Sequence, residues 1–318
     1  MMPMDATRRH SRILIIADIE GSSGCWDYRA SSFMTHSWAR ACLEMTRDVN
    51  VVVQALFDAG ARQVSIRDFH RTGYNLLSEH LDPRAHLVQG YRAGPVPGMG
   101  DPQETEAAMF LGMHPASGSG GVLPHTLTSR IRELRVNGRL VSEVELFAAS
   151  LAPFGLRPVF LSGDPVACRQ AEAAIHGIQT YAIEKNGGPS VFRPGPWRCG
   201  LARAAVKALA NNDARPYTPP GPLQARVLLR GGAPAARRLA RRWHLQAVGA
   251  ELRITSPDIH HLYRMLINLF FLTPTTERLL PLSLGLSRLY GRLGLGWVRW
   301  VLRRNHAAAT TALQECCR

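Results

Sequence analysis

The sequence has no run of about 18 apolar residues free of charge, which argues against an ordinary transmembrane helix. The first apolar stretch, residues 13–17, follows three arginines but is too short for a signal peptide, so we expect a cytoplasmic protein. None of the six cysteines has C-x-x-C spacing. Neither a disulfide framework nor a thiolate metal site is therefore indicated.

Lysine is also nearly absent, because Lys185 and Lys207 are the only two among 38 basic residues. The formal net charge of +14 is thus carried almost entirely by arginine. No zinc-finger spacing, RNP-like aromatic pattern or basic heptad array accompanies this charge, so we predict no nucleic-acid partner. The 318 residues, 46% of them hydrophobic, supply enough core for a folded protein of enzyme size.

Short apolar runs alternate with helical patterns along the first two thirds of the chain. The strand candidates are residues 12–17, 64–66, 107–113, 159–164 and 180–183. Helices are expected over residues 37–59, 143–154 and 201–210, with a glycine- and proline-rich loop over 186–196. An Asn137-Gly138 pair predicts a tight hairpin. The alternation favours an α/β fold with a mostly parallel sheet flanked by helices.

A proline cluster at residues 216–221 divides this pattern from a shorter one. Three further strand candidates (225–229, 245–248, 252–254) and two helices (235–243, 257–272) follow it. We therefore expect a catalytic region over residues 1–215 and a smaller second α/β subdomain over 216–272. From residue 273 the composition shifts to Leu, Gly, Arg and Trp, so 273–318 are interpreted as a C-terminal appendage.

Two carboxylates follow the first predicted strand. Asp18 and Glu20 are two residues apart, so both side chains project from one face if the strand continues that far. Such close carboxylates repel each other unless a cation lies between them. The alternative is one exposed loop carboxylate and one helix cap.

Two histidines follow the ends of two other predicted strands. His70 comes after the second strand and His114 after the third. Open α/β sheets place their sites at the carboxyl ends of parallel strands. Either histidine alone is more typical of a structural residue, but with Asp18 and Glu20 they indicate a metal site.

The ordered motifs around these residues resemble the DppA-type zinc-dependent D-aminopeptidase family. The matching text is Asp18-Ile19-Glu20-Gly21, Asp68-Phe69-His70, Gly112-Met113-His114, Gly121-Val122-Leu123-Pro124-His125 and Val141-Ser142-Glu143. The resemblance covers about residues 12–272.

The resemblance implies a site with two zinc ions. Asp18 would bridge the ions, Glu20 and His114 would complete one, and His70 and Glu143 would complete the other. His125 matches the family's catalytic histidine, with an acid/base or orienting role favoured over that of a nucleophile. The implied reaction is hydrolysis of the amide bond after an N-terminal, possibly D-, amino acid of a short peptide, in a ring-like homodecamer.

The sequence departs from the family pattern near Glu143 and, in part, over residues 185–199. This leaves open an amidohydrolase or esterase of specialised metabolism on the same metal site, or a non-catalytic metal-binding scaffold. Manganese or cobalt would suit the same ligands as zinc. Two nearby carboxylates have structural interpretations: Glu145 as a helix-surface residue rather than a ligand for a substrate amino group, and Asp164 as a helix cap.

The appendage has a basic helical face. Arg288, Arg292, Arg299 and Arg303 have spacings of four, seven and four, which place them together on a helix. The apolar complement is Leu286, Leu289, Leu293, Trp297 and Trp300. We expect this segment to pack on a neighbouring subunit or to contact an anionic membrane surface through residues 284–304, and otherwise to be disordered.

Overall fold

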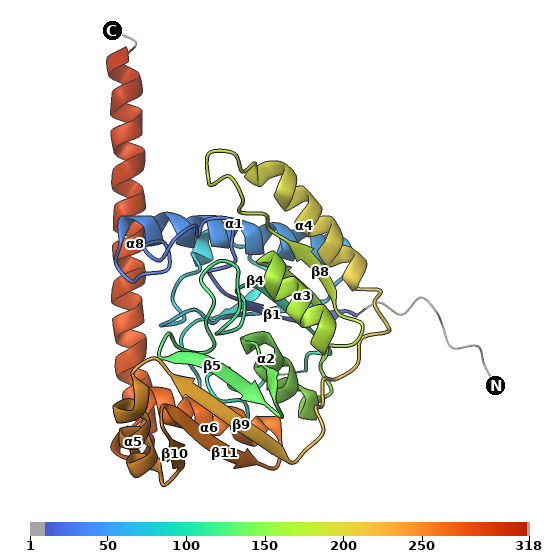
Figure 1. Ribbon diagram of the computed structural model, residues 1–318. Coiled ribbons are helices and arrows are strands. Elements are labelled where there is room, and N and C mark those ends of the chain that lie inside the picture. The colour runs from blue at the N-terminus through green and yellow to red at the C-terminus, as the bar shows by residue number, and fades with distance from the viewer. Residues whose placement is uncertain (1–9, 103, 317–318) are drawn as a thin grey trace, which may run out of the picture.

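Two β-sheets form the framework of the computed structural model, which describes residues 10–102 and 104–316 (Figure 1). The first sheet has six parallel strands in the order β3-β2-β1-β4-β7-β8. Its strands are β1 (Arg12–Ala17), β2 (Gln63–Asp68), β3 (His86–Val88), β4 (Ala107–Met113), β7 (Arg157–Gly163) and β8 (Gln179–Ala182). The prediction of a mostly parallel sheet flanked by helices is confirmed.

The second sheet has five antiparallel strands in the order β10-β11-β9-β5-β6. They are β5 (Ile131–Val136), β6 (Arg139–Leu140), β9 (Leu223–Leu229), β10 (Gln246–Val248) and β11 (Glu251–Ser256). The β5–β6 hairpin turns at Asn137 and Gly138, whose φ angles of 51° and 80° are those a tight hairpin requires. This sheet takes strands from both sides of the proline cluster, and the domain division at residue 216 stays a prediction.

Alternate residues of β1 enter two different hydrophobic cores. Ile13 and Ile15 pack with α1 (His36–Asp58) and α4 (Pro194–Ala208) on one face of the parallel sheet. Leu14 and Ile16 pack on the other face, where the second sheet lies with its helices. These helices are α2 (Glu143–Leu151), α3 (Pro165–Ala174), α5 (Gly232–Trp243) and α6 (Ile259–Phe271), and short 3-10 turns cover Ser78–His80 and Ala152–Phe154. The central strand is therefore buried on both faces.

Helix α4 begins earlier than the sequence pattern predicts. The composition predicts a loop through residue 196, but the helix starts at Pro194. Proline suits the first helical position, because its fixed φ is helical and its missing N–H has no partner there in any case. The proline-rich composition therefore marks a helix start rather than the end of a loop.

The C-terminal segment forms α7 (Pro274–Arg278) and the long helix α8 (Leu280–Cys316), which lies beside α1 and extends past the body (Figure 1). Leu295 and Val298 of α8 are buried in the α1 core. Trp297 stacks on Trp38 with ring centroids 6.1 Å apart. Of the predicted apolar set, Leu286, Leu289, Leu293 and Trp300 are instead exposed. No helix in the described part of the chain is long and apolar enough to cross a membrane.

Two glycines of α8 provide a matched test of its docking. A side chain at Gly294 would overlap the ring of Phe33, whereas one at Gly296 would meet nothing within 4 Å. We expect Gly294→Leu to weaken the packing of α8 by about 1–3 kcal/mol. Gly296→Leu should be neutral or stabilising by up to about 1 kcal/mol, because leucine favours helices over glycine. Thermal unfolding and limited proteolysis of α8 measure both, and equal behaviour of the two variants would contradict the observed packing.

Candidate metal centre

Four of the predicted ligands lie at the carboxyl edge of the parallel sheet. Asp18 directly follows β1, His70 lies two residues after β2, and His114 directly follows β4. The strand order places β1 between β2 and β4, so the carboxylate of Asp18 lies between the two histidines. These three side chains and Glu20 are all buried.

The two oxygens of Asp18 face different histidines. Oδ1 lies 3.1 Å from Nδ1 of His70, and Oδ2 lies 3.3 Å from Nε2 of His114. The Oδ1 atom also accepts a hydrogen bond from the backbone N–H of Ile19 at 2.8 Å, which fixes the orientation of the carboxylate. Asp18 thus has the geometry of a bridge between two neighbouring groups.

Each histidine has a second carboxylate partner. Oε2 of Glu20 lies 2.8 Å from Nδ1 of His70, and Oε2 of Glu143 lies 3.2 Å from Nε2 of His114. The potential ligand atoms form two groups, Asp18 with Glu20 and His70, and Glu143 with His114 and His125. The resemblance pairs Glu20 with His114 and His70 with Glu143, so the assignment of ligands to each ion stays a prediction.

Glu143 is positioned by the start of α2. Ser142 caps this helix, and its side chain accepts from the backbone N–H of Glu145 in a capping box. The Oε2 atom of Glu143 accepts a hydrogen bond from the backbone N–H of Leu127 at 3.0 Å. Helix α2 therefore directs its first side chain toward the sheet edge.

Glu145 is not the surface residue expected from its helical position. It is 1% exposed, accepts from the backbone N–H of Ser142 at 2.9 Å, and pairs with Arg139 at 2.5 Å. The hydroxyl of Tyr217 donates to it at 3.1 Å. The capping box turns this side chain back along the chain, so Glu145 holds the start of α2.

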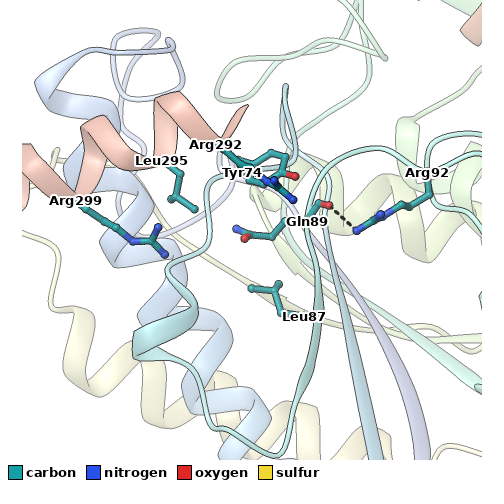
Figure 2. Close-up of a pocket in the computed structure, with 7 residues that line it drawn as sticks. All are labelled: Tyr74, Leu87, Gln89, Arg92, Arg292, Leu295 and Arg299. Atoms are coloured by element: carbon teal, nitrogen blue, oxygen red, sulfur yellow. Dashed lines mark hydrogen bonds between the residues drawn. The ribbon is translucent and has the colours of Figure 1, made fainter. Parts of the chain in front are cut away.

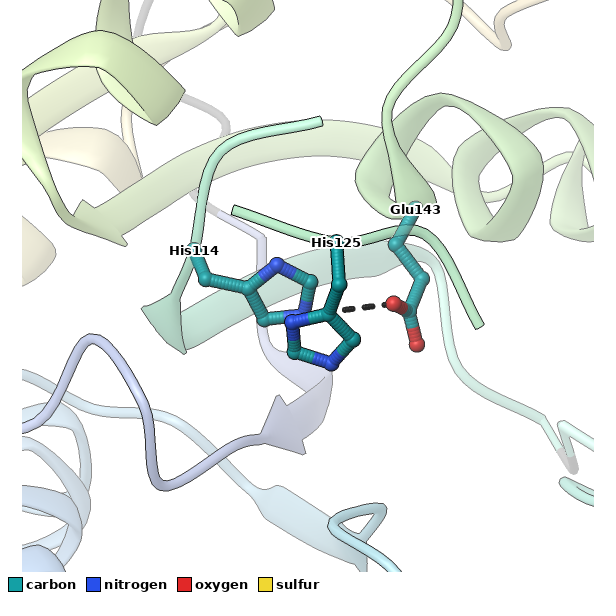
Figure 3. A group of neighbouring side chains, drawn as sticks. All are labelled: His114, His125 and Glu143. Atoms are coloured by element: carbon teal, nitrogen blue, oxygen red, sulfur yellow. Dashed lines mark ion pairs between the residues drawn. The ribbon is translucent and has the colours of Figure 1, made fainter. Parts of the chain in front are cut away.

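His125 comes from the loop between β4 and β5 and lies against His114 (Figure 3). The two rings stack with centroids 3.7 Å apart. Nε2 of His125 lies 3.9 Å from Oε1 of Glu20, and the side chain is 23% exposed against 6% or less for Glu20, His70 and His114. Burial and the neighbouring His114 lower the pKa of His125, which favours its neutral form.

All three histidines are oriented by backbone carbonyls. The pairs are His70 Nε2 with Ser31 at 3.0 Å, His114 Nδ1 with Pro115 at 3.1 Å and His125 Nδ1 with Leu123 at 2.9 Å. A carbonyl oxygen only accepts, so each of these nitrogens carries the proton. When a ring is neutral, its other nitrogen has a lone pair directed toward the carboxylates, as a metal ligand requires.

The carboxylates make this site strongly attractive to a cation. Burial, reinforced by the charge of Glu20, raises the pKa of Asp18 to about 7. Burial lowers the pKa of His70, but Glu20 and Asp18 outweigh it and raise the value to about 10. Burial is likewise outweighed at His114, where Glu143 raises the pKa to about 10. A bound metal ion would replace the protons that these histidines otherwise hold.

Two buried atoms of the cluster lack hydrogen-bond partners among the described residues. They are Oε2 of Glu20, which approaches His70 without hydrogen-bond geometry, and Nε2 of His114. A buried polar atom without a partner costs free energy. A metal ion would satisfy both atoms, and carboxylate and imidazole donors suit zinc, manganese and cobalt. The residues therefore fit a metal centre.

The loop that carries Glu20 is fixed by residues to which the sequence patterns assign no role. Nζ of Lys185 donates to the backbone oxygens of Glu20 at 2.8 Å and of Cys25 at 2.5 Å. Asp48 of α1 accepts from the backbone N–H of Ser23 at 2.8 Å and from Arg198 of α4 at 2.7 Å. Lys185 lies within residues 185–199, which match the family pattern only in part. Asp48 and Arg198 are 150 positions apart in the sequence, so no local pattern connects them.

Asp164 caps α3, as expected, and also holds the His125 loop. Its Oδ1 accepts from the backbone N–H of Val166 at 2.7 Å, and its Oδ2 accepts from that of Val122 at 2.9 Å. We expect Asp164→Ala to lose about 1–2 kcal/mol of stability and about tenfold in activity, because the loop loses its anchor.

Asp258→Ala is the matched control, since Asp258 caps α6 through the backbone N–H of His261 at 2.7 Å. It should lose a similar amount of stability and keep its activity. Denaturant unfolding and initial rates measure both effects. Equal activity of the two variants would limit Asp164 to its role as a cap.

The fold and the cluster define an α/β protein with a candidate metal centre of the kind found in hydrolases. The D-aminopeptidase family model matches residues 11–267, so the chain belongs to the D-aminopeptidase family and is a hydrolase. The resemblance inferred from the motifs is confirmed. The described tail, α7 and α8, lies beyond the matched residues.

Comparison with known proteins finds one similar sequence and one similar fold. A D-aminopeptidase of Bacillus subtilis (strain 168) is 29% identical over 215 residues, which cover 66% of this chain and 78% of the relative. Among solved structures, the zinc-dependent D-aminopeptidase DppA from Bacillus subtilis, described as a self-compartmentalizing protease, superimposes with a TM-score of 0.74. The match has 23% identity and covers 81% of this chain and 96% of the other, which shows a shared fold.

Proposed function

We propose that this chain is a zinc-dependent aminopeptidase with two metal ions, which hydrolyses the amide bond after the N-terminal, D-configured residue of a short peptide. The observation that carries the proposal is the geometry of Asp18, whose two oxygens face two separate histidines. Glu20 and Glu143 add a second carboxylate to each histidine. Membership of the D-aminopeptidase family supports the reaction class.

The ligands would be Asp18, Glu20, His70, His114 and Glu143, and His125 would serve the reaction. When bound, the zinc ions would supply an acidified water and a polarised scissile carbonyl. His125 would take a proton from the attacking water at Nε2 and return it to the leaving amine, since its Nδ1 already donates to the backbone oxygen of Leu123. The backbone oxygen of Leu123 holds the ring in that orientation.

The test combines metal analysis with a comparison of two substrates. The protein is stripped with a chelator, reloaded with zinc, manganese or cobalt, and assayed on D-alanine and L-alanine p-nitroanilides. We expect two ions per chain, loss of activity on stripping and recovery with zinc. Hydrolysis of simple amides or esters without aminopeptidase activity would favour the amidohydrolase or esterase alternative. Two bound ions without hydrolysis would favour a scaffold.

We further propose that the chain assembles with copies of itself, because the Bacillus protein of the same fold is self-compartmentalizing. An enclosed assembly would allow only short peptides to reach the metal centre. Sedimentation velocity measures the mass directly, and a monomer at working concentrations would contradict the proposal. The decameric state and the cytoplasmic location stay predictions.

A further inference from the structure

A cavity lies between α8 and the β3 edge of the parallel sheet (Figure 2). Its volume is about 490 Å³, and it shares no lining residue with the metal centre. The lining residues are Tyr74, Leu87, Gln89, Arg92, Arg292, Leu295 and Arg299. Three of them are arginines and none is acidic, so the cavity is suited to an anion.

Two of the three arginines lack an acidic partner among the described residues. Arg299 is paired with Glu79 through two hydrogen bonds of 2.8 and 2.9 Å, which lower the pKa of Glu79 to about 2. Arg92 donates to the backbone oxygen of Gln89 at 3.3 Å. Arg292 has no hydrogen-bond or ion-pair partner in the part of the chain that the structure describes. The positive charges of Arg92 and Arg292 are therefore not compensated within the cavity.

The packing of α8 fixes the position of Arg292 and Arg299. Arg292, Leu295 and Arg299 have the spacing of one helical face, and Leu295 is buried on the body. Any side chain at Gly291 would overlap the ring of Tyr74, so the helix backbone closely approaches that ring. Arg292, the next residue, is thereby held at the edge of the cavity across from the β3 segment.

We propose that this cavity binds the phosphate group of a phosphorylated ligand. Guanidinium groups form paired, charge-assisted hydrogen bonds with phosphate oxygens, and a multiply charged anion gains most from two uncompensated arginines. The volume leaves room for more than one phosphate group.

Two sources of this phosphate chemistry are compatible with the site. One is a free phosphorylated compound, and the other is the headgroup of an anionic phospholipid. The second source is considered because α8, the helix that carries Arg292, exposes the apolar side chains of Leu289, Leu293 and Trp300. The experiment separates the two sources.

The test compares two charge-matched double variants of the full chain. Arg92→Gln with Arg292→Gln removes the unpaired cavity charges. Arg237→Gln with Arg241→Gln removes two exposed charges from α5 and serves as control. Arg299 is left in place because it holds Glu79. Circular dichroism and hydrolytic activity confirm that each variant remains folded.

Binding of inorganic phosphate and tripolyphosphate is measured by titration calorimetry. Co-sedimentation uses phosphatidylcholine vesicles with and without phosphatidylglycerol. We expect the cavity variant to lose about tenfold or more in affinity and the control to match the native chain. If the cavity variant loses affinity only for the soluble phosphates, the ligand is a free phosphorylated compound. If it loses affinity for phosphatidylglycerol vesicles, the ligand is a phospholipid headgroup. Absence of binding by the native chain in every arm, or equal binding by both variants, overturns the proposal.

Discussion

Replacing Asp18 with alanine is expected to remove both metal ions and to lower hydrolysis by at least about a thousandfold. The carboxylate lies between His70 and His114, 3.1 and 3.3 Å from their nearest nitrogens. A shared bridging ligand screens two cations from each other, so its loss leaves them in mutual repulsion. Lewis-acid activation supplies several kcal/mol of transition-state stabilisation, and each 1.36 kcal/mol is worth tenfold in rate.

Metal analysis by mass spectrometry, together with initial rates, measures this effect. Asp213→Ala is the control, because Asp213 is an exposed carboxylate remote in sequence from every ligand. Glu20→Ala should weaken the binding of one ion more than that of the other, because Glu20 lies closer to His70 than to His114. An Asp18→Ala protein that retains two ions per chain would exclude the bridging role.

Replacing His125 with alanine is expected to lower turnover by about 10²–10⁴ while the fold and metal content persist. This is the usual contribution of a general acid or base. The Nε2 atom of His125 is free to accept a proton, because the Nδ1 atom donates to Leu123 at 2.9 Å. Its side chain is also more exposed than those of Glu20, His70 and His114, which suits contact with a substrate.

The metal content of this variant decides between two roles. The potential ligand atom of His125 lies within 4.8 Å of those of His114 and Glu143. A direct bond between His125 and a metal ion is therefore the competing interpretation. Loss of one ion in His125→Ala would identify a ligand, and near-native turnover would place the proton transfer elsewhere. His176→Ala, which removes an exposed histidine, is the control.

The motifs at the strand ends allow the candidate site to be predicted from the sequence. Apolar periodicity predicts strands over residues 12–17 and 107–113, and β1 and β4 cover those same ranges. Apolar runs bounded by polar residues mark buried strands, and such runs are local. The polar residues that follow them, Asp18 and His114, can therefore be selected from the sequence alone.

Residues whose roles depend on distant partners cannot be found in this way. Glu145 has the local pattern of a surface helix position, yet Arg139 and Tyr217 cover it. Arg198 reaches Asp48 across 150 residues of sequence. The composition of the appendage likewise contains no sign that Trp297 stacks on a tryptophan of α1 in its own chain. Hydrophobic periodicity carries no information on which distant segments meet.

The sequence by itself determined the α/β alternation, the ends of β1 and β4, and the residue types that make a metal-binding cluster. Only the tertiary structure decided that β1 lies between β2 and β4, and hence that Asp18 separates His70 from His114. It also decided which nitrogen of each histidine faces the carboxylates, through the carbonyls of Ser31, Pro115 and Leu123. The physical reason is that strand formation follows from local side-chain periodicity, whereas strand order and ring orientation follow from contacts between distant parts of the chain.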